Sequence, residues 1–389
     1  MSLTERVRIY EKVERHRGKP LILYVTSIRQ GASGQIAQDV ITELSYQLQS
    51  LPRDTKDLDF LVVSNGGDGT VAWRIVSLIR ERVKKFSILV PHAAFSAATL
   101  IALGADEIVM HPNGNLGPTD PQITNVKKGI QFSTEDLQAF LRFAREHVGL
   151  TEQGSLRDAF LKFSEEVGFV GIGAAARGTQ LSMSIGEKML LMHMAEADGK
   201  QSARAISESL NTKYFHHGYP LSRREAKEIG LPVAATDDTL DNLMWSIWRD
   251  IEAELRLREA FVPLELLKAD SNCSALFSPV AQIQFPVGAN PQLQQMLLQM
   301  FAQQVGLQKV PPASYENTLA LMESLRVASK SRIIGQIFAT RGYDLEFKIQ
   351  MAPETVGWVD VPLPLPVPEQ EPLAAPEPDE APKPIPPPT

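Results

Sequence analysis

The sequence predicts an α/β fold in which a parallel sheet is covered by helices. Short, continuous apolar runs recur in the N-terminal third of the chain, and segments with helical spacing alternate with them. Continuous apolar strands are typical of strands buried on both faces, and strands that alternate with helices form parallel sheets. The expected strands are residues 21–25, 60–64, 87–91 and 107–110. The expected helices of this region are residues 1–17, 35–51, 71–83 and one that begins near Ser96.

The rest of the chain differs from the N-terminal third in composition and in hydrophobic pattern. After residue 130 it is expected to be mainly helical, with one or two amphipathic helices in residues 134–167 and a methionine-rich helix in residues 178–197. Methionine fills irregular gaps between packed elements, so that helix indicates packing. Residues 255–330 show Gln-rich helical stretches and few strands. A late strand pair is expected at residues 331–338 and 345–351.

These patterns divide the chain into three parts. Residues 1–250 are expected to form one α/β domain, and residues 251–361 a C-terminal extension. Residues 362–389 contain twelve prolines and five acidic side chains against one lysine. Such a segment buries too little apolar surface to fold, which predicts a disordered tail. Binding of a partner to its Pro-rich pieces is the alternative to a passive tail.

Composition excludes several classes of protein. The formal net charge of −7 and pI near 5.6 argue against a nucleic-acid partner. Cys273 is the single cysteine, so the chain forms no internal disulfide and no cysteine metal cluster. The N-terminus lacks the apolar core of a signal peptide, and no run reaches the ~18–20 apolar residues of a membrane span. The sequence predicts a cytoplasmic protein without a cofactor or metal.

Two segments at strand ends indicate one active site. Ser64-Asn65-Gly66-Gly67 ends one apolar strand, and Ser96 follows the end of the next. A Gly-Gly turn exposes backbone N–H groups, and a serine beside it supplies a hydroxyl, as acyl transfer requires. Ligands of parallel sheets bind at the carboxyl ends of strands. Ser96 alone is equally consistent with a helix N-cap, so the pair of segments carries the prediction.

In these blocks the sequence resembles the Clp/crotonase-fold serine proteases, and within them the serine dehydrogenase proteinase family, which is related to signal-peptide peptidase A and the Clp protease. The resemblance covers roughly residues 20–235. The matching blocks are Ser64–Gly67, Phe95–Ala97, Ala102–Met110, Leu116–Gln122 and Tyr219–Val233. It implies a Clp/crotonase-like fold, Ser96 as nucleophile, an oxyanion hole formed by the N–H groups of Gly67 and Ala97, and assembly into a homo-oligomer.

The general base does not follow the Clp pattern. No histidine stands where Clp proteases carry one after the nucleophile, and Asp120 occupies that region instead. His111 comes too early and lies in a His-Pro step, which indicates a structural role. His216 and His217 precede the Leu221-Ser222 block, where the Clp pattern has an acidic residue. Relative to the Clp pattern the histidine and the acid are exchanged, which predicts a triad of Ser96, His217 and Asp120, with His216 as the alternative to His217.

Two further interpretations of the base stay open. A histidine pair in a loop is often only a helix cap or a subunit contact. A serine–lysine dyad, as in signal-peptide peptidases, would use Lys127 or Lys128, although both lie in what looks like an exposed turn.

The predicted function is a serine hydrolase, most consistent with a peptidase acting on peptides or proteins. The main alternative is a non-catalytic Clp-fold scaffold. Gly66-Gly67-Asp68-Gly69-Thr70 also resembles the phosphate-binding loop of lipid and NAD kinases, but the following strand lacks their second motif. Acyl-CoA chemistry would need a carboxylate at the site, and Asp68 is the nearest candidate. A helix N-terminal position is expected for Asp68.

Overall fold

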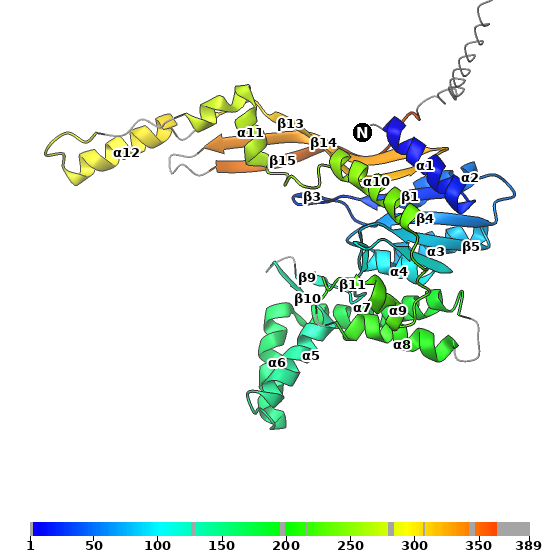
Figure 1. Cartoon of the computed structure of the whole chain (residues 1–389). Coiled ribbons are helices and arrows are strands. Elements are labelled where there is room, and N and C mark those ends of the chain that lie inside the picture. Colours follow the sequence, from blue (N-terminus) through cyan, green and yellow to red (C-terminus); the bar gives the residue numbers. More distant parts are fainter. Residues whose placement is uncertain are drawn as a thin grey trace, which may run out of the picture.

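The computed structural model describes residues 3–125, 129–194, 199–214, 216–278, 284–305, 308–341 and 347–363. In this part of the chain an eight-stranded sheet has the strand order β12-β14-β13-β1-β4-β5-β7, with β15 paired to β14 (Figure 1). Its strands are β1 (Leu21–Thr26), β4 (Asp57–Val63), β5 (Lys85–Val90), β7 (Glu107–Met110), β12 (Gln308–Lys309), β13 (Ala313–Ser324), β14 (Ala328–Arg341) and β15 (Phe347–Asp360).

The strands β1, β4, β5 and β7 pair in parallel, and this half carries the site. Every residue of β1 is buried, as its continuous apolar run predicts. The predicted fold class, an α/β fold with a parallel sheet covered by helices, is confirmed.

Helices cover both faces of this half because alternate side chains of each strand point to opposite sides. Ile22 of β1 and Phe60 of β4 pack in one cluster with the helices α2 (Val40–Ser50), α3 (Gly69–Arg82) and α4 (Ala97–Leu103). Leu23 and Leu61, one residue further along, pack in a second cluster with α1 (Leu3–Arg17) and α10 (Asp238–Glu254). The cores therefore lie on either side of the sheet.

The C-terminal strands extend the same sheet. β13 pairs antiparallel with β1, and β14 and β15 follow as an antiparallel ribbon that projects from the body of the molecule (Figure 1). The expected late strand pair is confirmed as β14 and β15, both longer than predicted. The prediction of mainly helical structure for residues 255–330 is wrong at β13, because pairing with β1 and β14 outweighs the helical preference of its Glu, Leu, Ala and Met residues. The rest of that region forms α11 (Pro263–Ala269), the 3-10 helix η1 (Ser271–Phe277) and α12 (Pro291–Val305).

A helical layer lies below the parallel strands in Figure 1. It contains α5 (Thr134–Glu146), α6 (Gln153–Val167), α7 (Phe169–Leu190), α8 (Gly199–Thr212) and α9 (Arg223–Glu228). Two helices therefore occupy residues 134–167. The methionine-rich helix begins earlier than predicted and ends at Leu190, and residues 195–197 of the prediction lie outside the described part of the chain.

Short strands tie the loops of the site together. β2 (Ile28–Arg29) pairs with β3 (Ala32–Ser33), and β9 (Ile123–Asn125) pairs with β10 (Ile130–Phe132). β8 (Asn115–Leu116) lies between β6 (Ala93–Ala94) and β11 (Leu221–Ser222). The predicted helix at residues 35–51 begins only at Val40, because Ile36 forms a β-bridge with Gly67 instead.

The domain boundaries at residues 250 and 361 stay a prediction. α10 runs through residue 250, and β13 belongs to the same sheet as β1. Most of the predicted tail, from residue 364 on, lies outside the described residues. None of the described helices combines the length and apolar character that crossing a membrane requires.

Candidate active site

The two predicted segments lie side by side at the carboxyl ends of β4 and β5. The N–H group of Ser64 donates to the carbonyl of Ala93 (2.8 Å), and the N–H group of Phe95 donates to the carbonyl of Ser64 (2.9 Å). Ser64 and Ala94 thus form a parallel bridge. This bridge sets the position of the Gly-Gly turn against the Ser96 loop.

Gly66 and Gly67 occupy backbone conformations that favour glycine, with φ of 109° and 149°. A Cβ atom on Gly66 would lie 2.6 Å from Cβ of Ser96, and one on Gly67 would lie 2.3 Å from the carbonyl oxygen of Ile36. The close approach of three chain segments therefore requires both glycines.

The turn leaves its central N–H group available. Ile36 donates to the carbonyl of Gly66 (2.9 Å), and Asp68 donates to the carbonyl of Ile36 (2.9 Å). In the described part of the chain, the N–H groups of Gly67 and Ala97 donate no hydrogen bond to another protein group. Ala97 is the first residue of α4, where helices leave N–H groups without internal partners.

Ser96 has a strained backbone. Its φ of 53° and ψ of −116° are unusual for a residue with a side chain, and such strain costs about 1–3 kcal/mol and clusters at functional sites. Ser96 stands at the N-cap position of α4, yet its side chain makes no capping hydrogen bond. The N-cap interpretation of this serine therefore does not account for its hydroxyl.

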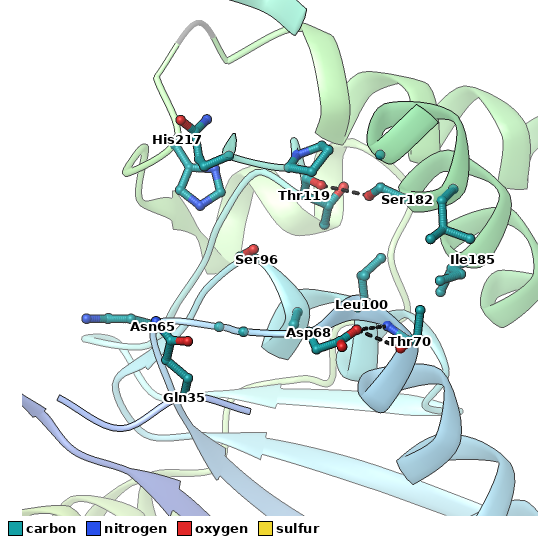
Figure 2. Close-up of a pocket in the computed structure, with 18 of the residues that line it drawn as sticks. Gln35, Asn65, Asp68, Thr70, Ser96, Leu100, Thr119, Ser182, Ile185 and His217 are labelled. Atoms are coloured by element: carbon teal, nitrogen blue, oxygen red, sulfur yellow. Dashed lines mark hydrogen bonds between the residues drawn. The ribbon is translucent and has the colours of Figure 1, made fainter. Parts of the chain in front are cut away.

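Ser96 opens into a pocket of about 540 Å³, which we call the Ser96 pocket. Figure 2 shows Ser96 between the loop that carries Asn65 and a facing wall with His217 and Thr119. Leu100, Leu181 and Ile185 give one side of the pocket an apolar lining. An adjoining pocket of about 400 Å³ begins at His217, and Asp120 and Tyr214 are among its lining residues.

The structure brings His217 and Asp120 into contact. Nδ1 of His217 lies 2.8 Å from Oδ1 of Asp120, and Gln122 donates to the second carboxylate oxygen at 2.7 Å. Because a carboxylate accepts, Nδ1 is the donor, and in a neutral imidazole Nε2 then carries the lone pair. No hydrogen bond joins Ser96 to His217 among the described residues, although both line the Ser96 pocket. Catalytic hydrogen bonds are often long before substrate binds.

Helices α7 and α8 hold the segment that carries Asp120. Thr119 is buried, its hydroxyl accepts from Nδ2 of Asn211 (3.0 Å), and its carbonyl accepts from Oγ of Ser182 (2.7 Å). The N–H group of Thr119 donates to the carbonyl of Leu210 (3.0 Å). Every polar group of Thr119 therefore has a partner, which fixes the start of the Asp120 segment.

The His217 loop is anchored at its far end. The hydroxyl of Tyr219 donates to Glu225 (2.6 Å), and Ser222 donates to the same carboxylate through its hydroxyl and N–H groups. These hydrogen bonds, that from Tyr219 first, lower the pKa of Glu225 below its ordinary value of 4.5. The loop is thereby tied to the start of α9.

The other predicted residues have different surroundings. Nδ1 of His216 accepts from the N–H group of Gly218 (3.0 Å), and His216 lines the adjoining pocket but not the Ser96 pocket. His111 accepts from the N–H group of Asn113 and stacks on Trp245, and burial lowers its pKa. Lys127 and Lys128 lie outside the described residues.

Asp68 has the role expected of it. Its carboxylate caps α3 by accepting from the N–H group of Thr70 (2.7 Å) and from the Thr70 hydroxyl (2.6 Å). Among the described residues, no three His, Cys, Asp or Glu side chains converge closely enough to hold a metal ion.

The sequence did not predict the residues that hold the loops of the candidate site in place. Ile36, Asn211 and Ser182 carry no motif, and only tertiary contacts show their part. Ser64 belongs to the predicted Ser64–Gly67 segment, but the sequence assigned no role to its side chain, which is fully buried. A small polar residue at the end of an apolar strand was the one available signal.

Comparison with known proteins finds two relatives of similar sequence. Two uncharacterised proteins of Methanocaldococcus jannaschii are each 26% identical to this chain, over 239 and 191 residues. The alignments cover 59% and 49% of this chain, and 72% and 58% of the two relatives.

Three solved structures are similar to parts of this chain. A serine-to-alanine mutant of the 1510-N membrane-bound stomatin-specific protease is 18% identical, with a TM-score of 0.36 over 57% of this chain and 83% of that one. A lysine-to-alanine mutant of the same protease, in complex with a substrate peptide, is 19% identical, with a TM-score of 0.34 over 57% and 78%. ClpP1 from Listeria monocytogenes is 16% identical, with a TM-score of 0.30 over 59% and 98%.

The family match covers the part of the chain that carries the Gly-Gly turn and Ser96. Residues 4–132 match the sequence model of a family described as ClpP-like SDH-type serine proteinase. This match confirms, over residues 4–132, the resemblance to the serine dehydrogenase proteinase family.

Proposed function

We propose that this protein is a serine peptidase that works through an acyl-enzyme on Ser96, with His217 as general base and Asp120 as its orienting acid. The observation that carries the proposal is the position of Ser96. Its hydroxyl makes no capping bond, and it stands beside two N–H groups without protein partners in the described residues. The family match of residues 4–132 supports the same reaction class.

The reaction begins when Oγ of Ser96 attacks the carbonyl carbon of a peptide bond while Nε2 of His217 accepts the hydroxyl proton. The oxygen of the tetrahedral intermediate becomes negative and accepts hydrogen bonds from the N–H groups of Gly67 and Ala97. Asp120 accepts from Nδ1 of His217, which keeps Nε2 unprotonated before the attack and stabilises the imidazolium after it.

The acyl-enzyme forms when His217 gives its proton to the departing amine and the C–N bond breaks. Water then attacks the ester on Ser96, His217 accepts a proton from that water, and the proton returns to Oγ of Ser96 as the acid product leaves. The substrate is a peptide or protein segment that fits the Ser96 pocket. Assembly into a homo-oligomer, as in Clp-like proteins, is part of the proposal.

Hydrolysis of a quenched fluorescent peptide library tests the assignments. We expect Ser96→Ala and His217→Ala to abolish turnover, because each removes a group that reacts directly. Asp120→Asn should lower kcat by up to about 10⁴-fold, as it favours the wrong tautomer of the imidazole. His216→Ala is the matched control next to the proposed base, and we expect it to keep most of the activity.

Two results would contradict the assignment of the base. Full activity after His217→Ala excludes His217. Loss of activity in Lys127→Ala or Lys128→Ala, with His217→Ala active, favours a serine–lysine dyad. A folded wild-type chain that hydrolyses no peptide favours a non-catalytic scaffold.

A further inference from the structure

We propose that the buried hydroxyl of Ser64, oriented by Thr26, is the positioning group that holds the Gly66-Gly67 turn in its oxyanion-binding conformation. The inference rests on the proposed function, because it assigns a role within the same reaction. Neither side chain lines the Ser96 pocket, so both act through the turn.

The hydrogen bonds run in a chain from β1 to the turn. Oγ1 of Thr26, the last residue of β1, lies 2.7 Å from Oγ of Ser64. The N–H group of Gly66 donates to that oxygen at 3.0 Å, and a longer contact of 3.3 Å joins the Ser64 hydroxyl to the carbonyl of Gly66. Both side chains are fully buried. Water therefore cannot reach these two hydroxyls to replace a hydrogen-bond partner that a substitution removes.

The direction of the Gly67 N–H group follows from the peptide unit to which it belongs. The carbonyl of Gly66 and the N–H group of Gly67 share one planar trans peptide and point in opposite directions. That carbonyl accepts from Ile36, so the N–H group of Gly67 points to the other side. Rotation of this peptide would aim a carbonyl oxygen at the developing oxyanion.

Two consecutive glycines offer little resistance to such a rotation, because glycine populates both signs of φ readily. The bond from Gly66 to Ser64 restrains the peptide unit before the one that carries the Gly67 N–H group. The turn is therefore held from one side by the backbone of Ile36 and from the other by the hydroxyl of Ser64. This arrangement explains why a polar residue, Ser64, directly follows the apolar strand β4.

Loss of this restraint should slow the chemical step and therefore lower kcat. Removing one oxyanion donor directly lowers kcat by about 10²–10³-fold. Removing the hydroxyl of Ser64 leaves the Gly67 donor present but less well aimed, so we expect a loss of about tenfold or more in Ser64→Ala, with KM little changed. Thr26→Val, which removes a hydroxyl one step further away at nearly constant volume, should cause a smaller loss.

The test measures the second-order rate constant for labelling of Ser96 by a fluorophosphonate across pH, on the full chain. The phosphoryl oxygen of the probe needs the same donors as a substrate oxyanion. We expect the plateau rate to fall in Ser64→Ala and Thr26→Val while the midpoint of the pH profile stays unchanged, because the base is untouched. Thr26→Ser restores the hydroxyl and should recover most of the rate lost in Thr26→Val.

Four results of this labelling experiment would overturn the role proposed for Ser64. A folded Ser64→Ala that is labelled at the wild-type rate overturns the inference. So does a shifted midpoint, since it shows that the base has moved. If Ser64→Ala fails to fold, equal rates for Thr26→Val and Thr26→Ser overturn it. A folded wild type that is not labelled overturns the proposed function, and the inference with it.

Discussion

Ser96 and Gly67 show how much a single residue's backbone contributes to this site. The strained conformation of Ser96 turns its hydroxyl away from capping α4, and the φ of Gly67 lets the turn approach Ile36. The sequence predicted both positions because a Gly-Gly pair and a serine at strand ends are local signals. It did not predict the role of Ser64, since the burial of a hydroxyl depends on which strands become neighbours.

Gly67→Ala should abolish labelling and destabilise the fold by about 1–3 kcal/mol. The added Cβ atom would lie 2.3 Å from the Ile36 carbonyl oxygen in a conformation strained for alanine. Gly173→Ala is the matched control, because the same substitution inside α7 meets nothing within 4 Å. It should stabilise by about 0.5–1 kcal/mol. Urea unfolding of both variants measures this difference, and equal stabilities would contradict it.

Glu225 gives the fold a dependence on acid pH. Its pKa is lowered in the folded state by hydrogen bonds, first from Tyr219, so its stabilisation is complete above the ordinary value of 4.5. It is lost as the pH falls through the folded-state pKa, because the unfolded chain takes up a proton that the folded chain excludes. Glu225→Gln should therefore show a shallower decline in unfolding temperature below pH 4.5 than the wild type. Identical declines would exclude this role.

At the level of elements, the site is an assembly of loops that helices and short strands hold in place. α7 and α8 fix Thr119, while β11 and the start of α9 fix the end of the His217 loop. The sequence predicted most of the helices and strands from their periodicity. It placed the start of α2 too early and missed β13, because a bridge to Gly67 and pairing with β1 are tertiary contacts that leave no local pattern.

Asn211→Ala tests whether α8 holds the Asp120 segment. The substitution removes the donor to the buried Thr119 hydroxyl, which should cost about 1–3 kcal/mol and reduce peptidase activity. Thr212→Ala is a control on the next residue of α8, where the hydroxyl is exposed and bonds only within its own helix. Peptide hydrolysis and thermal unfolding measure both effects. An Asn211→Ala protein with wild-type activity and stability would show that α8 does not position Asp120.

At the level of the whole molecule, residues that are far apart in the sequence come together in the candidate site. Nδ1 of His217 bonds to Asp120 across 97 positions of sequence, and His217 lies beyond residues 4–132, which match the family. The contact between His217 and Asp120 was predictable because both residues stand in recognisable blocks of the sequence. The joining of the C-terminal strands to β1 was not, since a separate extension and an extended sheet have the same local sequence pattern.

A buried ion cluster joins the first helix of the chain to α10 and β13. Arg6 of α1 contacts Asp250 and Glu254 of α10 and Glu323 of β13, and its side chain is fully buried. Tyr10 donates a further hydrogen bond to Glu323 (2.6 Å). The cluster therefore links the first helix, the helix above the sheet and the strand that extends it.

Arg6→Ala should destabilise the protein by about 3–5 kcal/mol, because it leaves buried carboxylates without their cation. Arg8→Ala, on the exposed side of the same helix, should change stability by less than about 0.5 kcal/mol. Urea unfolding followed by tryptophan fluorescence compares the two, since Trp245 and Trp248 lie on α10. A loss no larger in Arg6→Ala than in Arg8→Ala would contradict the importance of the cluster.

The central claim is that Ser96 is an activated nucleophile. The most direct measurement is the intact mass of the wild type and of Ser96→Ala after reaction with a fluorophosphonate probe. The account predicts one adduct on the wild type and none on a folded Ser96→Ala. A folded wild type without an adduct, or an adduct that persists in Ser96→Ala, would contradict it.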